Sequence, residues 1–454
     1  MQQFKLLGSA LAAAVILVAC GGGGDGNQSP AVAYTSVVSF GDSLSDAGSY
    51  KVGPIAALGG GQFTVNGITG AVGSDPVPSY TWAQVLSAAV VGKASCAAHT
   101  GGFGVARSAV IAGCTDYAQG GARVTEAAGP GNTGQTSGVF TGAMTEPVVT
   151  QVASYLTDLN NGGKFSGKEL VTVLAGANDI FAQTDKLKAD ATAAGSTAFV
   201  QSLVQRLAAG ATSPAAAATA IGTALAGLPA GTAMDTVVGT AVGTAAIQPG
   251  NAAVASPAVY GPMVVAAQTD AATAGAQYAA TTGATTAVTG MVTAATQLVA
   301  SVKGMLANGA THIAVSNLPD VSQTPMAMAQ DASSRALILA MTSAFNNALK
   351  AGLTGTAGVV LIDAFAENQR QMADPAHYAL TNTTATACNL NYPNNPLATN
   401  GVANSGSSLA CKSSNLIAGD TSHYAFADSV HPTPYMHKLL AQFVTKQLIL
   451  AGWL

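Results

Sequence analysis

Charged residues are scarce in this sequence. Lysine, arginine, aspartate and glutamate make up 8% of its 454 residues, and the net charge is −4. No segment is basic enough to follow the phosphates of a nucleic acid, so we expect no nucleic-acid partner. Much of the surface must instead consist of neutral threonine, serine, asparagine, glutamine, alanine and glycine.

Patterns typical of metal and nucleotide sites are also missing. The sequence has no Cys-x-x-Cys and no cluster of histidine and cysteine with metal-ligand spacing. Residues 129–134 match a dinucleotide-binding glycine pattern, but no strand precedes them. Residues 162–168 resemble a phosphate-binding loop, but Glu169 stands where serine or threonine would hold magnesium, and a strand follows where a helix is required. We therefore expect no metal and no cofactor.

The apolar run at the N-terminus, residues 6–18, is too short to span a bilayer as a mature helix. It follows Lys5 and has the shape of a secretory signal. Its end resembles the lipobox of bacterial lipoproteins, in which the cysteine is lipidated. Residues 1–19 are therefore expected to be a signal peptide, Cys20 the lipidated first mature residue, and residues 20–34 a Gly-rich flexible tether.

This N-terminus predicts export and a lipid anchor in a membrane. By resemblance to lipoproteins, the lack of an aspartate directly after Cys20 favours sorting to an outer membrane, facing either the periplasm or the cell surface. If Cys20 is not lipidated, the same segment is an ordinary signal peptide and the protein is secreted.

Four further cysteines remain, and an even number in an exported chain predicts two disulfides. Four cysteines allow three pairings. We favour the two bonds between sequence neighbours because each would close one loop. These bonds are Cys96 with Cys114 and Cys388 with Cys411.

A short strand followed by a serine stands near the start of the expected folded region. The apolar run from Ser36 to Gly41 predicts a buried strand, and Ser43 follows in a polar turn. Open α/β sheets place their chemistry at the carboxyl ends of strands. Asp42 and Asp46 are expected to brace the turn through backbone hydrogen bonds. The Gly-x-Ser-x-Gly pattern of α/β-hydrolases is absent around this serine, which disfavours that fold.

Three later stretches have the same polar character: Asp-Tyr-Ala-Gln-Gly-Gly-Ala-Arg at 116–123, Gly-Ala-Asn-Asp at 176–179, and Asp-Ser-Val-His at 428–431. With Phe40–Leu44 they follow the chain order of the four signature blocks of the GDSL lipase/esterase family, also called SGNH hydrolases. The sequence resembles this family from about Thr35 to its C-terminus, apart from a long middle segment. Its first block looks most like the phospholipase and lipase branch.

Strands alternate with helices through residues 35–454, which predicts a parallel sheet with helices on both faces. The family resemblance implies one domain with a three-layer α/β/α, flavodoxin-like fold. The pattern fails between about 184 and 293, where alanine, threonine and glycine dominate. We interpret this segment as an insertion of small-residue helices and loops beside the active-site face. An amphipathic helix is expected after it, over residues 294–308.

The blocks contain the groups that acyl transfer requires. Ser43 is the candidate nucleophile. His431 is the candidate base, because only histidine has an unperturbed pKa near neutrality. Asp428 can reach the other ring nitrogen and hold the tautomer. Pro432 disfavours the helical region for the residue before it, so the histidine should precede the last helix.

The resemblance also implies an oxyanion hole formed by the backbone N–H of Ser43, a glycine N–H and the side-chain amide of Asn178. Either Gly120 or Gly121 could supply the glycine N–H, and the family pattern favours Gly121. Asp116 stands where many relatives have asparagine, which leaves the structural role of this position open.

These observations predict an exported, lipid-anchored serine esterase or lipase that acts on small-molecule or lipid esters without a cofactor. An acyltransferase and a carbohydrate O-acyl esterase are alternatives, since they share the mechanism and differ in acceptor and pocket. A catalytically silent surface lipoprotein that serves in binding is the non-enzymatic alternative. Against it stands the intact set of four blocks.

Overall fold

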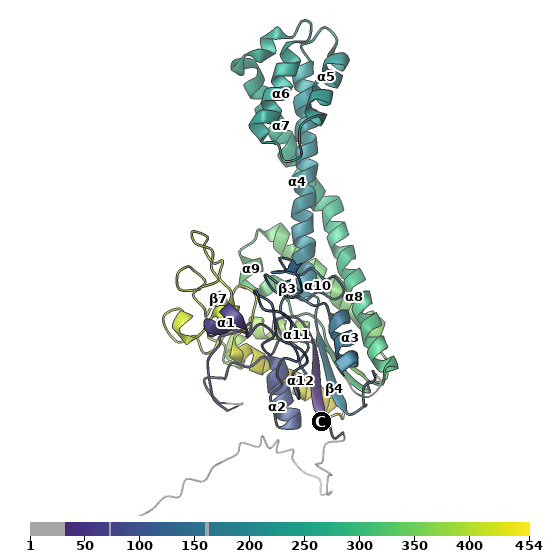
Figure 1. Ribbon diagram of the computed structural model, residues 1–454, viewed down its shortest axis with the longest axis vertical. Coiled ribbons are helices and arrows are strands. Elements are labelled where there is room, and N and C mark those ends of the chain that lie inside the picture. The colour runs from purple at the N-terminus through teal and green to yellow at the C-terminus, as the bar shows by residue number, and fades with distance from the viewer. Residues whose placement is uncertain (1–31, 72–73, 159–162) are drawn as a thin grey trace, which may run out of the picture.

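The computed structural model describes residues 32–71, 74–158 and 163–454. The predicted signal peptide, the lipidation site at Cys20 and most of the tether lie outside the described residues. Within these three ranges, no helix combines the length and the apolar character needed to cross a membrane. The described chain forms an α/β body from which a long helical stalk projects (Figure 1).

A four-stranded parallel sheet lies at the centre of the body. In spatial order its strands are β1 (Ser36–Gly41), β4 (Glu169–Leu174), β5 (His312–Ser316) and β6 (Val359–Ile362). Every residue of β4 is buried, as is all of β1 except its first residue. Such continuous burial is typical of a parallel sheet that is covered on both faces.

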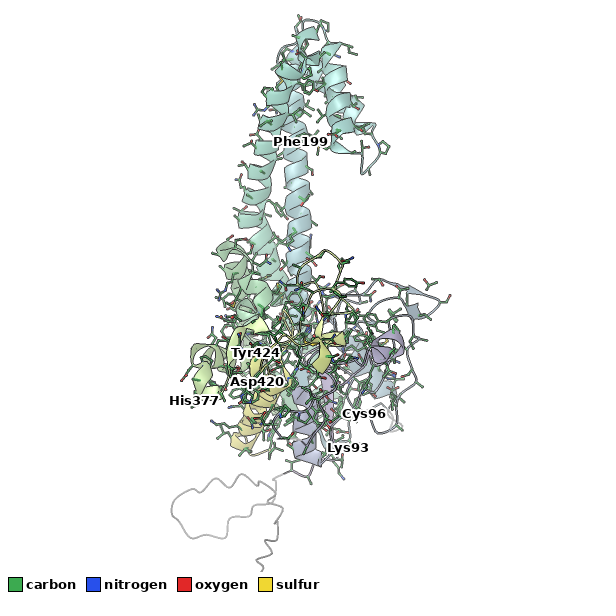
Figure 2. All side chains as sticks on the ribbon, turned by 90° about the vertical axis from the view of Figure 1, so that its left-hand side faces the viewer. Lys93, Cys96, Phe199, His377, Asp420 and Tyr424 are labelled. Carbon is green, nitrogen blue, oxygen red and sulfur yellow. A yellow bond between two sulfur atoms is a disulfide. The ribbon has the colours of Figure 1, made fainter. Side chains whose placement is uncertain are left out.

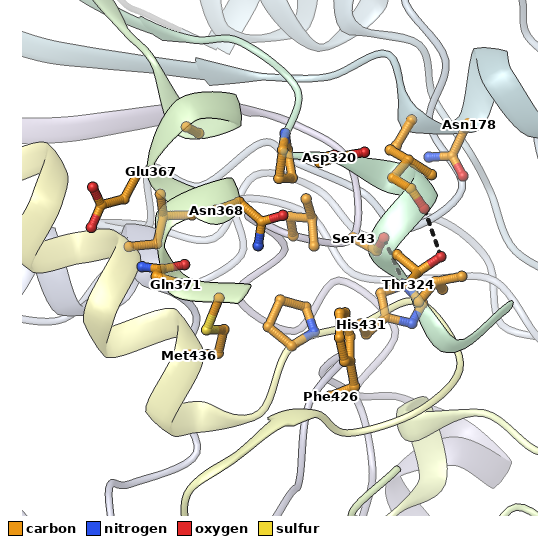
Figure 3. A pocket seen from close by; sticks show the side chains of 18 of the residues that line it. Ser43, Asn178, Asp320, Thr324, Glu367, Asn368, Gln371, Phe426, His431 and Met436 are labelled. Atoms are coloured by element: carbon orange, nitrogen blue, oxygen red, sulfur yellow. Dashed lines mark hydrogen bonds between the residues drawn. The ribbon is translucent and has the colours of Figure 1, made fainter. Parts of the chain in front are cut away.

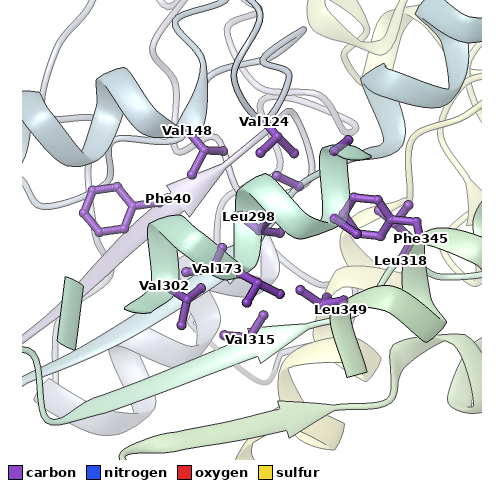
Figure 4. Packing of buried hydrophobic residues seen from close by; sticks show 14 of the residues in the cluster. Phe40, Val124, Val148, Val173, Leu298, Val302, Val315, Leu318, Phe345 and Leu349 are labelled. Carbon is purple, nitrogen blue, oxygen red and sulfur yellow. The ribbon is translucent and has the colours of Figure 1, made fainter. Parts of the chain in front are cut away.

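Helices cover both faces of the sheet. Consecutive residues of β4 point to opposite sides, so Leu170 joins the apolar cluster on one face and Val171 the cluster on the other. In the cluster that contains Val171, Val173 packs with Leu298 and Phe345 (Figure 4). The predicted three-layer α/β/α fold is confirmed. The covering helices are α2 (Trp82–Val91) and α12 (Pro434–Leu450) on the first face, and α3 (Val148–Asp158), α8 (Ala284–Ala307) and α10 (Ala332–Leu353) on the second.

Shorter elements connect these layers. They are α1 (Gly53–Ala57), β2 (Gln135–Thr136), β3 (Val139–Phe140), α9 (Pro325–Met328), α11 (Ala364–Ala373), β7 (Asn382–Thr386) and β8 (Tyr424–Phe426). Two of them, α11 and β8, lie next to the carboxyl edge of the sheet and contribute to the site described below.

The stalk is built from the segment that the sequence predicts to be an insertion. One helix rises from the sheet, a second returns beside it and continues into α8, and two shorter helices pack at the tip (Figures 1 and 2). The tip has its own buried apolar cluster, which includes Phe199, Leu203 and Ile221. The stalk helices before α8 are α4 (Ala177–Ala208), α5 (Pro214–Ala226), α6 (Met234–Ala246) and α7 (Pro257–Tyr278).

This stalk is more helical than the sequence analysis predicts. Its return helix α8 begins at Ala284, earlier than the helix expected from residue 294. Alanine and threonine give only a faint apolar stripe, so the helical periodicity of such a segment is weak. Alanine is nevertheless the strongest helix former. Threonine hydroxyls are satisfied within the helices, as in the 3.1 Å bond from Thr285 to the carbonyl of Thr281.

Two disulfides close loops in the body, and they have the pairing favoured from the sequence. They join Cys96 to Cys114 and Cys388 to Cys411. The second bond lies beside Ser408. The side-chain amide of Asn66 donates to the carbonyls of Ser408 and Cys411, at 3.0 Å each, and further fixes this loop.

Buried His437 should make the fold sensitive to acid. Its Nδ1 accepts a hydrogen bond from the backbone N–H of Trp82 at 3.3 Å. Burial lowers the pKa of His437 from 6.5 to about 3. The unfolded chain therefore takes up this proton at a higher pH than the folded chain does. The contribution of His437 to the free energy of unfolding is complete above about pH 6.5. Below that pH it falls by about 1.4 kcal/mol per pH unit.

Urea unfolding of the wild type and of His437→Gln at several pH values tests this expectation. Titrating groups that do not interact with His437 contribute equally to both proteins. The difference between the two free energies of unfolding therefore reports the titration of His437 and its coupling to His431. This difference should increase from pH 3 to pH 6.5 with the slope given above. A difference that does not depend on pH would contradict the prediction.

Candidate active site

The turn after β1 places Ser43 at the carboxyl edge of the sheet. A Cβ atom at Gly41 would lie 2.1 Å from the carbonyl oxygen of Leu174, so only glycine fits at the end of the strand. Asp42 accepts a hydrogen bond from the backbone N–H of Leu44 at 3.0 Å, which fixes the turn around the serine. Burial raises the pKa of the Asp42 carboxyl to about 7 despite this bond.

Asp46 ties the second block to this turn. Its carboxylate accepts hydrogen bonds within the turn and one from the backbone N–H of Gly120 at 2.9 Å. Asp42 and Asp46 thus brace the turn as predicted. The N–H of Gly120 is occupied by this contact. The N–H groups of Gly121 and Ser43, in contrast, donate no hydrogen bond within the described part of the chain, and so they are free to bind a ligand.

The segment before these glycines runs along β1 like an edge strand. The N–H of Tyr117 donates to the carbonyl of Ser39 at 2.8 Å, and this pairing brings Gly121 to the same edge as Ser43. Gly121 has a φ of +80°, and a Cβ atom there would lie 2.4 Å from the carbonyl oxygen of Pro130. Backbone angle and available space therefore both require glycine at this position.

Asp116 lies buried at the start of this segment. Its Oδ1 accepts a hydrogen bond from the N–H of Ala118 at 3.1 Å. Burial, together with the nearby Asp46 carboxylate, raises the pKa of Asp116 well above its usual value. Asp116 therefore braces the chain at the start of the second block.

β4 and α4 bring Asn178 to the same edge. A Cβ atom at Gly176 would lie 2.6 Å from the ring of Phe345, so the link between strand and helix must be glycine. Asn178 Nδ2 donates to the carbonyl of Ala122 at 2.9 Å, which joins the third block to the second. An amide nitrogen carries two hydrogens, so one remains for a ligand. Asn178 and Ser43 line the same pocket (Figure 3).

His431 bridges Ser43 and Asp428. Its Nε2 lies 2.8 Å from Ser43 Oγ, and its Nδ1 lies 2.9 and 2.8 Å from the two carboxylate oxygens of Asp428. α12 begins at Pro434, so the histidine precedes the last helix as expected. The ring of Phe63 packs 4.8 Å from the imidazole, between centroids. The structure thus brings together the three side chains selected from the sequence.

Asp428 is held as a carboxylate by its surroundings. It accepts hydrogen bonds from the backbone N–H groups of Ser408 at 2.7 Å, Val430 at 3.0 Å and His431 at 2.8 Å. Burial alone would raise the pKa of Asp428, but the charge of His431 and these hydrogen bonds hold it well below its usual value. An ionised carboxylate therefore faces the imidazole at neutral pH.

Two pockets meet at Ser43 and His431. The first lies between α11 and α12, and the second lies on the Gly121 side. Phe181 lines both pockets, and Phe63 lines the second. Neither phenylalanine can be recognised as a site residue from the sequence, because apolar residues that line a pocket have the same pattern as apolar residues of a core.

A comparison with protein-family models agrees with this geometry. A family model described as GDSL-like lipase/acylhydrolase matches residues 37–245 and 264–444. The matched ranges contain every side chain of the site described above, and the gap between them falls at the stalk tip. A search of curated proteins returned no match.

Proposed function

The chain belongs to the GDSL-like lipase/acylhydrolase family, and we propose that it is a serine hydrolase that cleaves carboxylic esters through an acyl-enzyme. Ser43 is the nucleophile, His431 the general base and acid, and Asp428 the group that orients the imidazole. The observation that carries this proposal is the unbroken chain from Ser43 Oγ through both ring nitrogens to Asp428, with contacts of 2.8 Å on each side. General-base activation of a serine requires such contacts.

In the acylation step, Ser43 Oγ attacks the ester carbonyl carbon while its proton passes to His431 Nε2. The imidazolium that forms is stabilised by the Asp428 carboxylate at Nδ1. His431 then gives the proton to the oxygen of the departing alcohol. In the second step His431 takes a proton from water, whose oxygen attacks the acyl carbon. The bond from this carbon to Ser43 Oγ then breaks, His431 returns the proton to Oγ, and the carboxylic acid leaves.

The negative charge on the carbonyl oxygen needs donors that are already in place. The free N–H groups of Ser43 and Gly121 and the remaining amide hydrogen of Asn178 are the proposed set. The bond from Gly120 to Asp46 supports the choice of Gly121. Loss of one such donor typically lowers turnover by about 10²–10³-fold.

Hydrolysis of p-nitrophenyl esters from acetate to palmitate, combined with covalent labelling, tests this function. We expect turnover of at least the shorter esters. We also expect a fluorophosphonate, which reacts with activated serines, to inactivate the protein and to modify the peptide that contains Ser43. Unfolded protein should not be labelled, because activation depends on the contact with His431.

Two results would count against the proposal. One is absence of ester hydrolysis by protein that shows a cooperative thermal melt. The other is labelling at a serine other than Ser43 together with loss of activity.

A further inference from the structure

The pocket between α11 and α12, called here the amide pocket, carries two amide side chains besides that of Asn178. Ser43 and His431 lie at one side of it, and Gln371 and Met436 lie at the other, with Asn368 between them (Figure 3). Most of its remaining wall is apolar. Both amide side chains come from α11, three residues apart, and so they share one face of that helix.

Neither amide has a partner. Gln371 is only 3% exposed and Asn368 is half-buried, yet neither side chain makes a hydrogen bond within the described residues. The polar atoms of both amides remain accessible from the pocket, so a ligand there can form hydrogen bonds with them. Two unpaired amides facing the pocket that contains the nucleophile are therefore donors and acceptors available to a substrate.

The charges around the pocket restrict what can bind there. Asp320 and Glu367 line it, and among its described lining residues there is no lysine or arginine. Arg370 is the nearest cation on α11, and it is paired with Glu367 at 2.6 Å. A phosphate would face these carboxylates without a lysine or arginine to compensate its charge. A hydroxyl group can donate to a carboxylate or an amide oxygen and accept from an amide N–H, so it matches every polar group present.

We propose that the amide pocket binds a neutral, hydroxyl-bearing part of the ester substrate, and that Gln371 and Asn368 determine this specificity. The inference rests on the proposed esterase function. The hydroxyl can belong to the alcohol, as in a glycerol or sugar ester, or to the acyl chain, as in a hydroxyacyl ester. In either case the pocket selects against substrates that place a phosphate there.

The test uses two pairs of esters that differ by hydroxyl groups. Glycerol monobutyrate against propyl butyrate examines the alcohol, and ethyl 3-hydroxybutyrate against ethyl butyrate examines the acyl chain. The specificity ratio is kcat/KM for the hydroxylated ester divided by kcat/KM for its partner. In Gln371→Met, which keeps the length of the side chain and removes the amide, we expect this ratio to fall about three- to tenfold for one pair.

The control is Gln442→Met, the same substitution at an exposed position of α12, where both ratios should match the wild type. If Gln371→Met does not melt cooperatively, Asn368→Leu provides the same comparison. The pair that responds identifies the source of the hydroxyl. If kcat/KM falls equally for both members of each pair, the role of Gln371 is merely structural. If no kcat/KM value changes, Gln371 has no role. Either result overturns the inference.

Failure of the inference can be distinguished from failure of the proposed function. If the wild type hydrolyses propyl and ethyl butyrate but the ratios do not respond, only the inference fails. If the wild type hydrolyses p-nitrophenyl esters but none of these four, the inference fails alone. If it hydrolyses no ester of either set, the proposed function fails and the inference falls with it.

Discussion

Replacing Ser43 by alanine is expected to lower kcat for p-nitrophenyl butyrate by about 10⁶-fold. The change removes only the Oγ atom, which lies 2.8 Å from His431 Nε2. The backbone N–H of residue 43 and the donors from Gly121 and Asn178 are retained. Residual hydrolysis about 10³-fold above the uncatalysed rate is therefore expected, because binding and charge stabilisation do not need the nucleophile.

Ser429→Ala is the matched control, since this serine lies next to Asp428 and its side chain makes no hydrogen bond in the described part of the chain. Its kcat should stay within a few-fold of the wild type. The size of the loss in Ser43→Ala also separates two mechanisms. A nucleophilic serine gives the full loss, whereas a loss of only about tenfold would mean that water attacks the ester directly and that Ser43 merely positions it.

The three side chains of the proposed triad could be predicted because short local sequences fix where each one points. Asp42 closes the turn that carries Ser43, and Asp428 accepts the N–H groups of the loop that carries His431. Because the carboxyl ends of parallel strands share one edge, residues that follow different strands converge there. Residue types and chain order, together with the family resemblance that they carry, were therefore enough to select these positions.

The choice between Gly120 and Gly121 could not come from residue type, because both are glycine. It depends on Asp46, 74 residues earlier in the chain, whose carboxylate occupies one of the two N–H groups. Asp428 likewise depends on a distant segment. Its carboxylate accepts a hydrogen bond from the N–H of Ser408, which lies in the loop closed by the disulfide between Cys388 and Cys411. Such contacts between distant segments have no signature in the local sequence.

The full helical extent of the stalk and the amide pocket escaped prediction for two other reasons. Alanine and threonine produce little amphipathic contrast, so the long helix α4 gives a weak periodic signal although its residues favour helix. For Gln371, the residue type itself suggests the wrong location. A glutamine on a helix is ordinarily interpreted as a solvent-facing residue, and only the packing of α11 against α12 turns its face toward a pocket.

Asp428→Asn is expected to lower kcat by about 10⁴-fold while leaving the fold intact. The carboxylate of Asp428 accepts from three backbone N–H groups and from His431 Nδ1, so every neighbouring group is a donor. An asparagine can keep its oxygen on the N–H groups of Val430 and His431 only by turning its NH₂ group toward Ser408 and the imidazole.

That arrangement would reverse the hydrogen bond at the histidine. Nδ1 would accept from the new amide, the proton would move to Nε2, and a protonated Nε2 cannot take the proton of Ser43. The measurement is kcat beside the thermal midpoint, with Asp420→Asn as a control, since Asp420 is an exposed carboxylate that braces another turn. A loss below about tenfold in a folded Asp428→Asn protein would mean that the imidazole keeps its tautomer without the carboxylate. In that case Asp428 would serve to hold the loop that carries His431, and His431 alone would activate the serine.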